Sequence, residues 1–136
     1  MNLNTYVFFN GQCREAFEFY AKALGGKIVM MQTYAESPEA ERVSKDWRGK
    51  IIHARLRLGD HVLMGSDAPP ERFRSPQGFD LNVGVADPAE AERIFQALAA
   101  GGKVLMPIGE TFWAVRFGAL VDQFGIPWMV NCEKAA

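Results

Sequence analysis

The feature that most restricts the fold of this chain is an internal repeat. Residues 15–30 read EAFEFYAKALGGKIVM, and residues 90–106 read EAERIFQALAAGGKVLM, with one additional alanine before the paired glycines. Each copy runs from Glu-Ala through an apolar pair to Gly-Gly-Lys, two aliphatic residues and Met. Such a repeat predicts two copies of one supersecondary unit, so we expect the chain to fold as two related halves.

Each copy of the repeat predicts an amphipathic helix. Asn10-Gly11 and Asp87-Pro88 supply start signals, and the paired glycines end both helices because glycine readily adopts the left-handed conformation. Apolar residues recur at helical spacing in both copies, namely Ala16, Phe19, Tyr20, Ala23 and Leu24 in the first and Ala91, Ile94, Phe95 and Leu98 in the second.

Outside the helices the apolar residues alternate with a period of two, which is typical of β-strands. The fold class is therefore predicted to be α+β, a single domain (residues 1–136) of two βαβββ modules, 1–67 and 79–136, joined by a linker at 68–78. Residues 35–50 have no counterpart in the second module and are expected to form a mobile or partly helical insertion. The predicted strands are residues 5–9, 27–33, 51–58, 62–66, 79–85, 103–108, 112–121 and 126–131.

Alternation also predicts which face of each sheet lies under its helix. In residues 52–58 the even positions are aliphatic, whereas His53, Arg55 and Arg57 fall on the other face. The strand before the second helix likewise turns Asp80 and Asn82 away from the helix. We expect these polar faces to enclose a small-molecule cleft. The alternative is that they simply face solvent, as one side of many antiparallel sheets does.

Composition excludes several classes of function. The 15 basic and 16 acidic side chains form no basic stripe, so neither nucleic acid nor a membrane is an expected partner. No stretch approaches the ~20 apolar residues of a membrane span and no signal peptide is evident, so we expect a cytoplasmic protein. Cys13 and Cys132 are expected to be reduced thiols.

Several segments together resemble one known family. The entry FNGQCREAFEFYAKALGG, the hairpin HARLRLGDHVLMGSDAPP and the ending ETFWAVRFGALVDQFGIPWMVN are similar to the PhnB-like branch of the vicinal oxygen chelate superfamily. That superfamily also contains glyoxalase I, extradiol dioxygenases and bleomycin-resistance proteins. The resemblance implies a cupped, incomplete barrel of two βαβββ modules, a homodimer, and a ligand in the cup.

The resemblance also implies where a metal ion would bind. In metal-using members, the first and last strands of each module supply four ligands, usually His, Glu or Gln. On this chain those positions fall on Thr5, near Met64, near Asp80 and on Met129. Threonine and thioethers are poor ligands for hard or borderline divalent ions, so we expect no metal ion and no cofactor in the cup.

The residues expected to bind the small molecule come from both modules. His53 lies beside Arg55, whose cation favours a neutral imidazole suited to act as a base or to hydrogen-bond an anion; a structural bond across strands is equally consistent. Trp113 alternates with Val115 and Phe117 to form an apolar wall, or packs in the core. The predicted lining is completed by Thr5, Met64, Asp80, Met129 and Asn131.

Two further residues have competing interpretations. Cys13 falls in the first turn of the first helix, where the helix dipole favours a thiolate. No histidine is near it in sequence, however, so we interpret it as a buried apolar residue. Glu110 is predicted to form a structural ion pair with Arg116.

Three functions remain open from the sequence. The first is a metal-free protein that binds a small molecule in the cup. The second is a glyoxalase- or dioxygenase-like enzyme that uses His53 and Asp80, with or without metal. The third is a drug-sequestering resistance protein, but the acidic cup that would suit a cationic drug is not evident, given His53 and Arg55 on the polar face.

Overall fold

The computed structural model describes residues 1–135 and contains two compact units. The first unit is Met1–Arg74 and the second begins at Ser75. The boundary lies within residues 68–78, the segment predicted as a linker. No helix in the described part of the chain combines the length and apolar character needed to cross a membrane.

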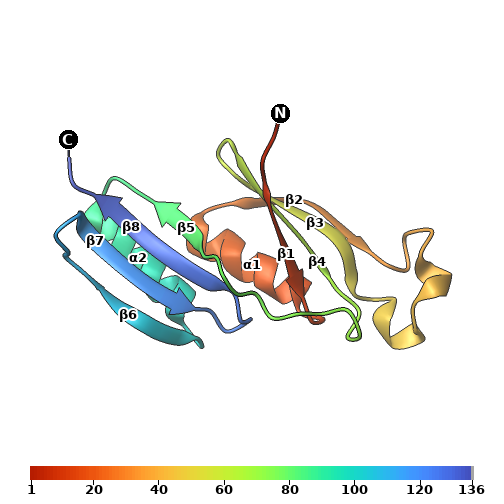
Figure 1. The fold of residues 1–136 in the computed structure, drawn as a ribbon. Coiled ribbons are helices and arrows are strands. Elements are labelled where there is room, and N and C mark those ends of the chain that lie inside the picture. The colour runs from red at the N-terminus through yellow and green to blue at the C-terminus, as the bar shows by residue number, and fades with distance from the viewer. Residues whose placement is uncertain (136) are drawn as a thin grey trace. The chain divides into compact units, whose positions relative to one another are not determined.

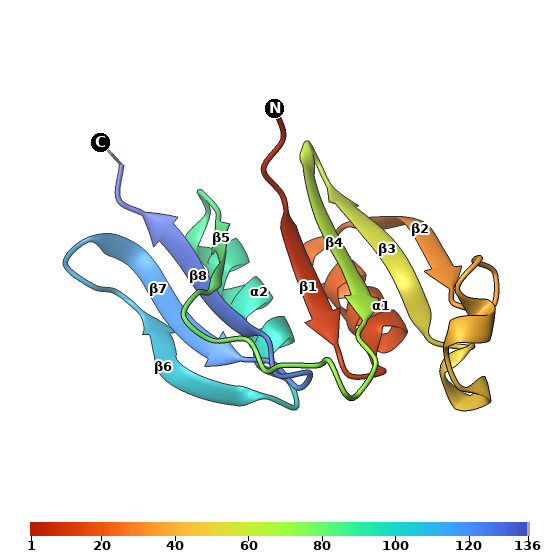
Figure 2. The same cartoon turned by 45° about the vertical axis from the view of Figure 1, so that its right-hand side comes forward.

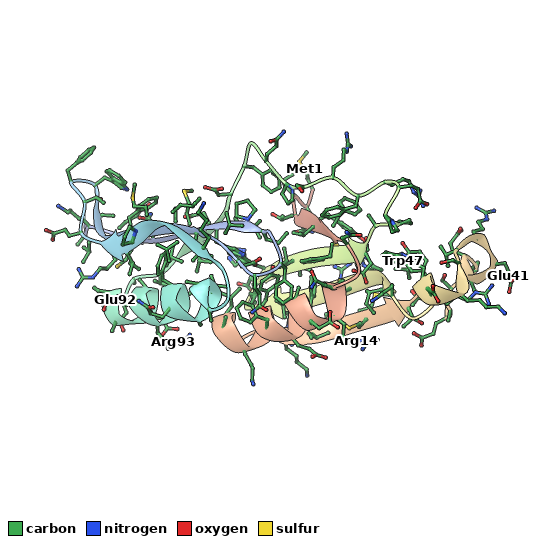
Figure 3. All side chains as sticks on the ribbon, turned by 90° about the horizontal axis from the view of Figure 1, so that it is seen from below. Met1, Arg14, Glu41, Trp47, Glu92 and Arg93 are labelled. Carbon is green, nitrogen blue, oxygen red and sulfur yellow. The ribbon has the colours of Figure 1, made fainter. Side chains whose placement is uncertain are left out.

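The first unit is a four-stranded sheet with one helix (Figure 1). The strand order is β1-β4-β3-β2, with β1 parallel to β4 and the other pairs antiparallel. Two short 3₁₀ helices, η1 and η2, lie in the insertion, where Figure 3 labels Glu41 and Trp47. The elements are β1 (Thr5–Phe9), α1 (Cys13–Leu24), β2 (Lys27–Thr33), η1 (Ala40–Arg42), η2 (Lys45–Trp47), β3 (Ile51–Leu58) and β4 (His61–Asp67).

The second unit repeats this topology without the insertion. Its strand order is β5-β8-β7-β6, with β5 parallel to β8, so each unit is a βαβββ module as predicted. The elements are β5 (Leu81–Gly84), α2 (Pro88–Ala99), β6 (Lys103–Gly109), β7 (Ala114–Val121) and β8 (Pro127–Glu133).

Each helix covers one face of the sheet in its own unit (Figure 2). In the first unit Phe17 packs on Gly65, where an added Cβ would come within 2.9 Å of the ring. In the second unit Phe95 packs on Gly118, where the corresponding distance is 2.6 Å. Ala16, Tyr20 and Ala23 of the stripe predicted for α1 are buried, but Phe17 rather than Phe19 is the phenylalanine that packs in the core. The stripe predicted for α2 is confirmed.

A buried carboxylate holds the start of α1 against the end of β4. Asp67 Oδ1 accepts a hydrogen bond from the Cys13 backbone N–H at 2.9 Å, and Oδ2 accepts one from the Ile51 N–H at 2.8 Å. Gln12, the N-cap residue, makes no side-chain capping bond. The predicted Asn10-Gly11 start signal is therefore not the cap, because the capping carboxylate comes from a distant strand. In α2, by contrast, Asp87 accepts from Ala89 N–H as expected.

A second buried carboxylate organises the hairpin between β7 and β8. Asp122 Oδ1 accepts hydrogen bonds from the N–H groups of Phe124 and Ile126 at 2.8 and 3.0 Å. Its Oδ2 accepts from Trp128 Nε1 at 2.9 Å. Trp128 and Ile126 are themselves buried. The sequence DQFGIPW thus forms a turn whose first residue ties together the loop backbone and a core side chain.

Candidate functional site

The helix-free side of the first sheet, here called the first open face, collects side chains from all four strands. Residues paired across neighbouring strands project to the same side of a sheet. Because Val7, Ala54, Leu56 and Gly65 face α1, the intervening residues face the other way. Following the strand register, the first open face consists of Tyr6, Phe8, Lys27, Met30, Gln32, His53, Arg55, Arg57, Val62, Met64 and Ser66.

An exposed aromatic group extends over this face from the edge strand β1 to β3. The Tyr6 and His53 rings stack with centroids 5.7 Å apart and planes 24° apart, and the Phe8 centroid lies 5.1 Å from that of Tyr6. A hydrogen bond of 3.1 Å joins the Tyr6 hydroxyl to His53 Nδ1. Tyr6 is 36% exposed and Phe8 52% exposed. These rings are therefore outside the packed core and available to contact a ligand.

The imidazole of His53 is held in its neutral form. Partial burial lowers its pKa, and the neighbouring Arg55 cation lowers it further. Since Nδ1 is engaged with Tyr6, Nε2 is the ring nitrogen left to exchange a proton or a hydrogen bond with a bound molecule. The prediction that the Arg55 cation favours the neutral form of His53 is confirmed, because Arg55 lowers the His53 pKa.

The first open face is cationic. Lys27, Arg55 and Arg57 all lie on it, and Lys27 pairs with Arg57 across β2 and β3. The only acidic residue in the four strands, all of which are described, is Asp67, and it is buried on the helix side. Within residues 1–135, no carboxylate forms a salt bridge with Arg55 or Arg57. This face therefore favours negative charge in a ligand.

The helix-free side of the second sheet, the second open face, carries one cation, Lys103, and one carboxylate, Glu133. Trp113 lies just before β7, with its ring centroid 5.4 Å from that of Phe117 and 4.8 Å from that of Phe112. Trp113 is 45% exposed, so the structure places it outside the core. By register, the second open face consists of Asn82, Gly84, Lys103, Met106, Gly109, Phe117, Ala119, Val121, Pro127, Met129 and Asn131, with Glu133 at the end of β8.

Asn131 contributes an unsatisfied acceptor to the second open face. Its Oδ1 is buried, yet no group in residues 1–135 donates a hydrogen bond to it. A buried amide oxygen without a donor costs about 1–3 kcal/mol. A ligand hydroxyl or amine that donates to this oxygen would recover that cost.

Two of the predicted lining residues lie elsewhere. Thr5 pairs with Leu63 and shares the helix side with Val7, so the prediction that it faces the helix-free side is wrong by one residue. Asp80 precedes β5, which begins at Leu81, so Asn82 rather than Asp80 occupies the matching strand position. His53, Arg55, Met64, Met129 and Asn131 do lie on the open faces.

Tyr6 and Phe8 were missed by the sequence reasoning, although the signal was present. Val7 and Phe9 alternate with them in TYVFF, and alternation alone places Tyr6 and Phe8 opposite the buried pair. The predicted Glu110–Arg116 pair is also wrong. Arg116 Nε instead contacts Glu92 Oε1 of α2 at 3.3 Å, and Figure 3 labels Glu92 on that helix.

Similarity to known proteins identifies the family to which this chain belongs. The family model described as 3-demethylubiquinone-9 3-methyltransferase matches residues 1–131. Protein YjdN of Escherichia coli K12 is 35% identical over 98% of this chain and 97% of its own length. The chain belongs to this PhnB-like family. The resemblance drawn from the sequence is thereby confirmed.

Solved structures of similar proteins agree with the PhnB-like assignment. Protein PA1353 from Pseudomonas aeruginosa is 46% identical, with a TM-score of 0.90 and 99% of both chains covered. A PhnB protein from Bacillus cereus is 28% identical, with a TM-score of 0.82 over 97% of this chain and 99% of that one. A glyoxalase/bleomycin resistance/dioxygenase family enzyme from Burkholderia phytofirmans, 16% identical, has a TM-score of 0.66 and covers 96% and 97%. This last likeness shows the shared fold alone.

The side chains of this PhnB-like chain do not fit the divalent metal site that the superfamily implies. By register the first and last strands place Tyr6 with Met64 and Asn82 with Met129 on the open faces. None of these supplies a carboxylate or an imidazole. Among residues 1–135, no three His, Cys, Asp or Glu side chains lie close enough together to hold a metal ion.

Cys13 is equally unsuited to nucleophilic chemistry in this PhnB-like chain. Its side chain is fully buried, and burial raises the pKa of the thiol far above its usual range, with the negative charge of Asp67 adding to the effect. Desolvation and the Asp67 charge therefore outweigh the helix dipole that was considered from the sequence. Cys13 acts as a small core residue beneath Asp67.

Proposed function

We propose that this PhnB-like protein binds a small molecule through its open faces, without a resident divalent metal ion. The observation that carries the proposal is the exposed group Tyr6, Phe8 and His53 on a sheet face that its helix does not cover. Solvent-exposed rings beside an unpaired arginine provide contact area and a polar anchor at once. A face that merely met water would have no need of three such rings.

The second open face offers a candidate binding surface of its own. Trp113 and Phe117 offer a further aromatic surface, and Asn131 Oδ1 offers an acceptor without a protein donor. The proposed ligand-binding residues are thus Tyr6, Phe8, His53, Arg55, Met64, Trp113, Met129 and Asn131. Met64 and Met129 add adaptable apolar surface.

The methyl transfer named in the family description is not proposed for this chain. Nucleotide-like methyl donors are commonly held at a glycine-rich turn between a strand and a helix. The turn after β1 has one glycine, Gly11, and Lys50 Nζ donates to its carbonyl at 3.0 Å. Trp47 and Lys50 side-chain atoms lie 3.5 Å from where a Gly11 Cβ would be, so this turn does not fit such a donor.

The proposal is tested by screening metabolites for thermal stabilisation and then mapping any hit. Replacement of Tyr6 and Phe8 by Leu should weaken binding at least tenfold while leaving the melting temperature of the free protein nearly unchanged. Phe79→Leu, which alters an exposed ring before β5, is the matched control. Unchanged affinity in the Tyr6 and Phe8 variants, or no hit from a broad library, would refute the proposal.

An enzymatic role for His53 is the second candidate, favoured by its bond to Tyr6 and its lowered pKa. A neutral imidazole with one nitrogen fixed is suited to act as a general base. If the protein turns over its ligand, His53→Ala should abolish turnover and retain folding, and Asp80→Asn should have little effect because Asp80 precedes the strand. Full turnover by His53→Ala would eliminate this candidate.

We also propose that the chain forms a homodimer through its edge strands. β2 and β6 are the outer strands of their sheets, and both expose apolar side chains, namely Val29, Met30, Val104, Leu105 and Met106. Exposed apolar edges favour association with a second chain. Light scattering after size exclusion should report a dimer that Leu105→Glu converts to monomer and that Leu3→Glu leaves intact. A monomeric wild type would exclude it.

A further inference from the structure

The charge pattern of the first open face narrows the class of ligand, and this step rests on the proposed function. Lys27, Arg55 and Arg57 come from two adjacent strands and project from one side of the sheet. Across β1 to β4 the single carboxylate, Asp67, is buried on the other side. The overall net charge of the chain is −1, yet three cationic side chains lie together on one face of this sheet.

The aromatic group and these cations lie on the same side of the sheet. Arg55 pairs with Met64, which in turn pairs with Tyr6, so the guanidinium and the ring are two strands apart on the same side. His53 is adjacent to Arg55 along β3 and stacks on Tyr6. Arg55 therefore borders the edge of the aromatic group, where a charged substituent on a stacked ring would lie.

The polar groups on this face offer no carboxylate to a cationic ligand. Arg55 and Arg57 donate only, and the Tyr6 hydroxyl is already joined to His53. A cation would meet like charge without a nearby carboxylate, which costs binding energy. An anion would meet guanidinium donors, which bind the two oxygens of a carboxylate with two parallel hydrogen bonds.

We propose that the first open face binds an anionic aromatic small molecule, with its ring on Tyr6 and Phe8 and its negative group on Arg55. Arg55 is the specificity-determining residue for charge, and the two aromatic residues determine the preference for a planar ring. His53 Nε2 supplies an additional hydrogen bond to the same ligand.

A titration with four matched probes tests this assignment on the full chain. The probes are 2-naphthoate, its neutral amide, the cationic 2-naphthylmethylamine, and the saturated decahydronaphthalene-2-carboxylate. By ¹H–¹⁵N NMR, 2-naphthoate should bind at least fivefold more tightly than each of the other three and shift the amide signals of β1 and β3. Its affinity should fall as the salt concentration rises.

Two variants, each of which removes one arginine, distinguish a direct contact between Arg55 and the ligand from an effect of the protein's net charge on affinity. Arg55→Met should remove the preference for naphthoate over the amide, reducing it to less than twofold. Arg14→Met, on the exposed surface of α1 (Figure 3), should leave the preference intact. Equal loss in both variants would overturn the Arg55 assignment, because it would show a general effect of net charge.

The remaining outcomes separate this inference from the proposed function. Tight binding of the amide or the amine that Tyr6→Leu weakens would overturn the anion inference and leave small-molecule binding in place. A short single-stranded RNA that bound the same face while all four probes failed would overturn both. Naphthoate binding that survives both Arg55→Met and Tyr6→Leu would place the ligand elsewhere and also overturn the inference.

Discussion

His53 should make the stability of the protein depend on pH in a defined direction. Its pKa in the folded protein lies below the ordinary value of about 6.5. At a pH between the folded and the unfolded pKa, His53 is protonated in the unfolded chain but neutral in the folded protein. The free energy of unfolding therefore falls as the pH drops below about 7, and this loss is complete once the pH is below the folded pKa. The groups that face His53 are Tyr6, Arg55, Gln32 and Ser66.

Urea denaturation at pH 7.5 and pH 5.0 measures this effect. His53→Gln should lose less stability than the wild type on acidification, whereas His61→Gln, at the exposed start of β4, should behave as the wild type. The chain has two histidines, so this pair of variants isolates the contribution of His53. An identical pH dependence in the wild type and His53→Gln would contradict the assignment of a neutral, stacked imidazole.

Asp122 should be one of the most sensitive polar positions for stability. Its carboxylate accepts three hydrogen bonds, two from loop N–H groups and one from the Trp128 indole. Replacing it by Ala leaves buried donors without acceptors, which should cost about 3 kcal/mol. Asp60→Ala, in the exposed turn of the β3–β4 hairpin, should cost less than about 0.5 kcal/mol. Equal chemical-denaturation midpoints for the two variants would show that the Asp122 bonds are dispensable.

Some candidate site residues lie on the open faces as the sequence predicted, and others do not. His53 and Arg55 followed from alternation within a strand, whereas Thr5, Met64, Asp80 and Met129 came from counting along a family pattern. For Thr5 the count was one residue off, and an error of one residue moves a side chain to the opposite face of a sheet. The unpaired oxygen of Asn131 and the stacking of Tyr6 on His53 depend on strand register, which no single strand encodes.

At the scale of elements, each helix depends on a glycine in the sheet beneath it. Phe17 and Phe95 fill the space that a side chain at Gly65 or Gly118 would occupy. Gly65→Ala and Gly118→Ala should each cost about 1–3 kcal/mol, because the ring must shift or the helix must move away. Gly84→Ala, where no atom lies within 4 Å of the new Cβ, is the control for loss of glycine itself. Denaturant midpoints for the three variants check this, and equal values would refute the packing argument.

Helices and strands were predictable because apolar residues recur with different periods in the two. The contacts that determine where the helices begin and end were harder to predict. The left-handed Gly25 that ends α1 and the Asp87-Pro88 start of α2 are local signals, and both were recognised. The start of α1 depends on Asp67, 54 residues away from Cys13. Tertiary capping of this kind leaves no local pattern, so the sequence suggested Asn10 instead.

Considered as a whole molecule, the chain is a duplication whose two open faces have diverged in chemistry. The strand register makes Met64 equivalent to Met129, and both copies retain methionine. Their neighbours differ: Arg55 corresponds to Ala119, His53 to Phe117 and Phe8 to Gly84. One face therefore carries two arginines and stacked rings, whereas the other carries amides and apolar surface beside Lys103. This difference is the reason for placing the anionic ligand on the first open face.

Among residues 1–135 neither open face brings three metal-ligating side chains together, and this predicts that stability and binding do not depend on a divalent ion. A resident ion present at about one hundred times its dissociation constant would contribute about 2.7 kcal/mol to the free energy of unfolding. Its removal would lower the melting temperature of a chain this size by several degrees. Dialysis against EDTA should instead change the melting temperature by less than about 1 °C, much less than the loss of a bound ion would cause.

The same metal-free protein should bind 2-naphthoate with unchanged affinity, and readdition of Zn²⁺, Ni²⁺ or Mn²⁺ should not tighten binding. Tyr6→His combined with Met64→Glu offers a positive control, because it adds an imidazole and a carboxylate at paired positions on β1 and β4. In that variant Zn²⁺ should raise the melting temperature, which shows that the assay detects a metal on this face. A chelator-sensitive wild type would mean that methionine, tyrosine and asparagine at these positions do not prevent metal binding, and the metal-free proposal would be wrong.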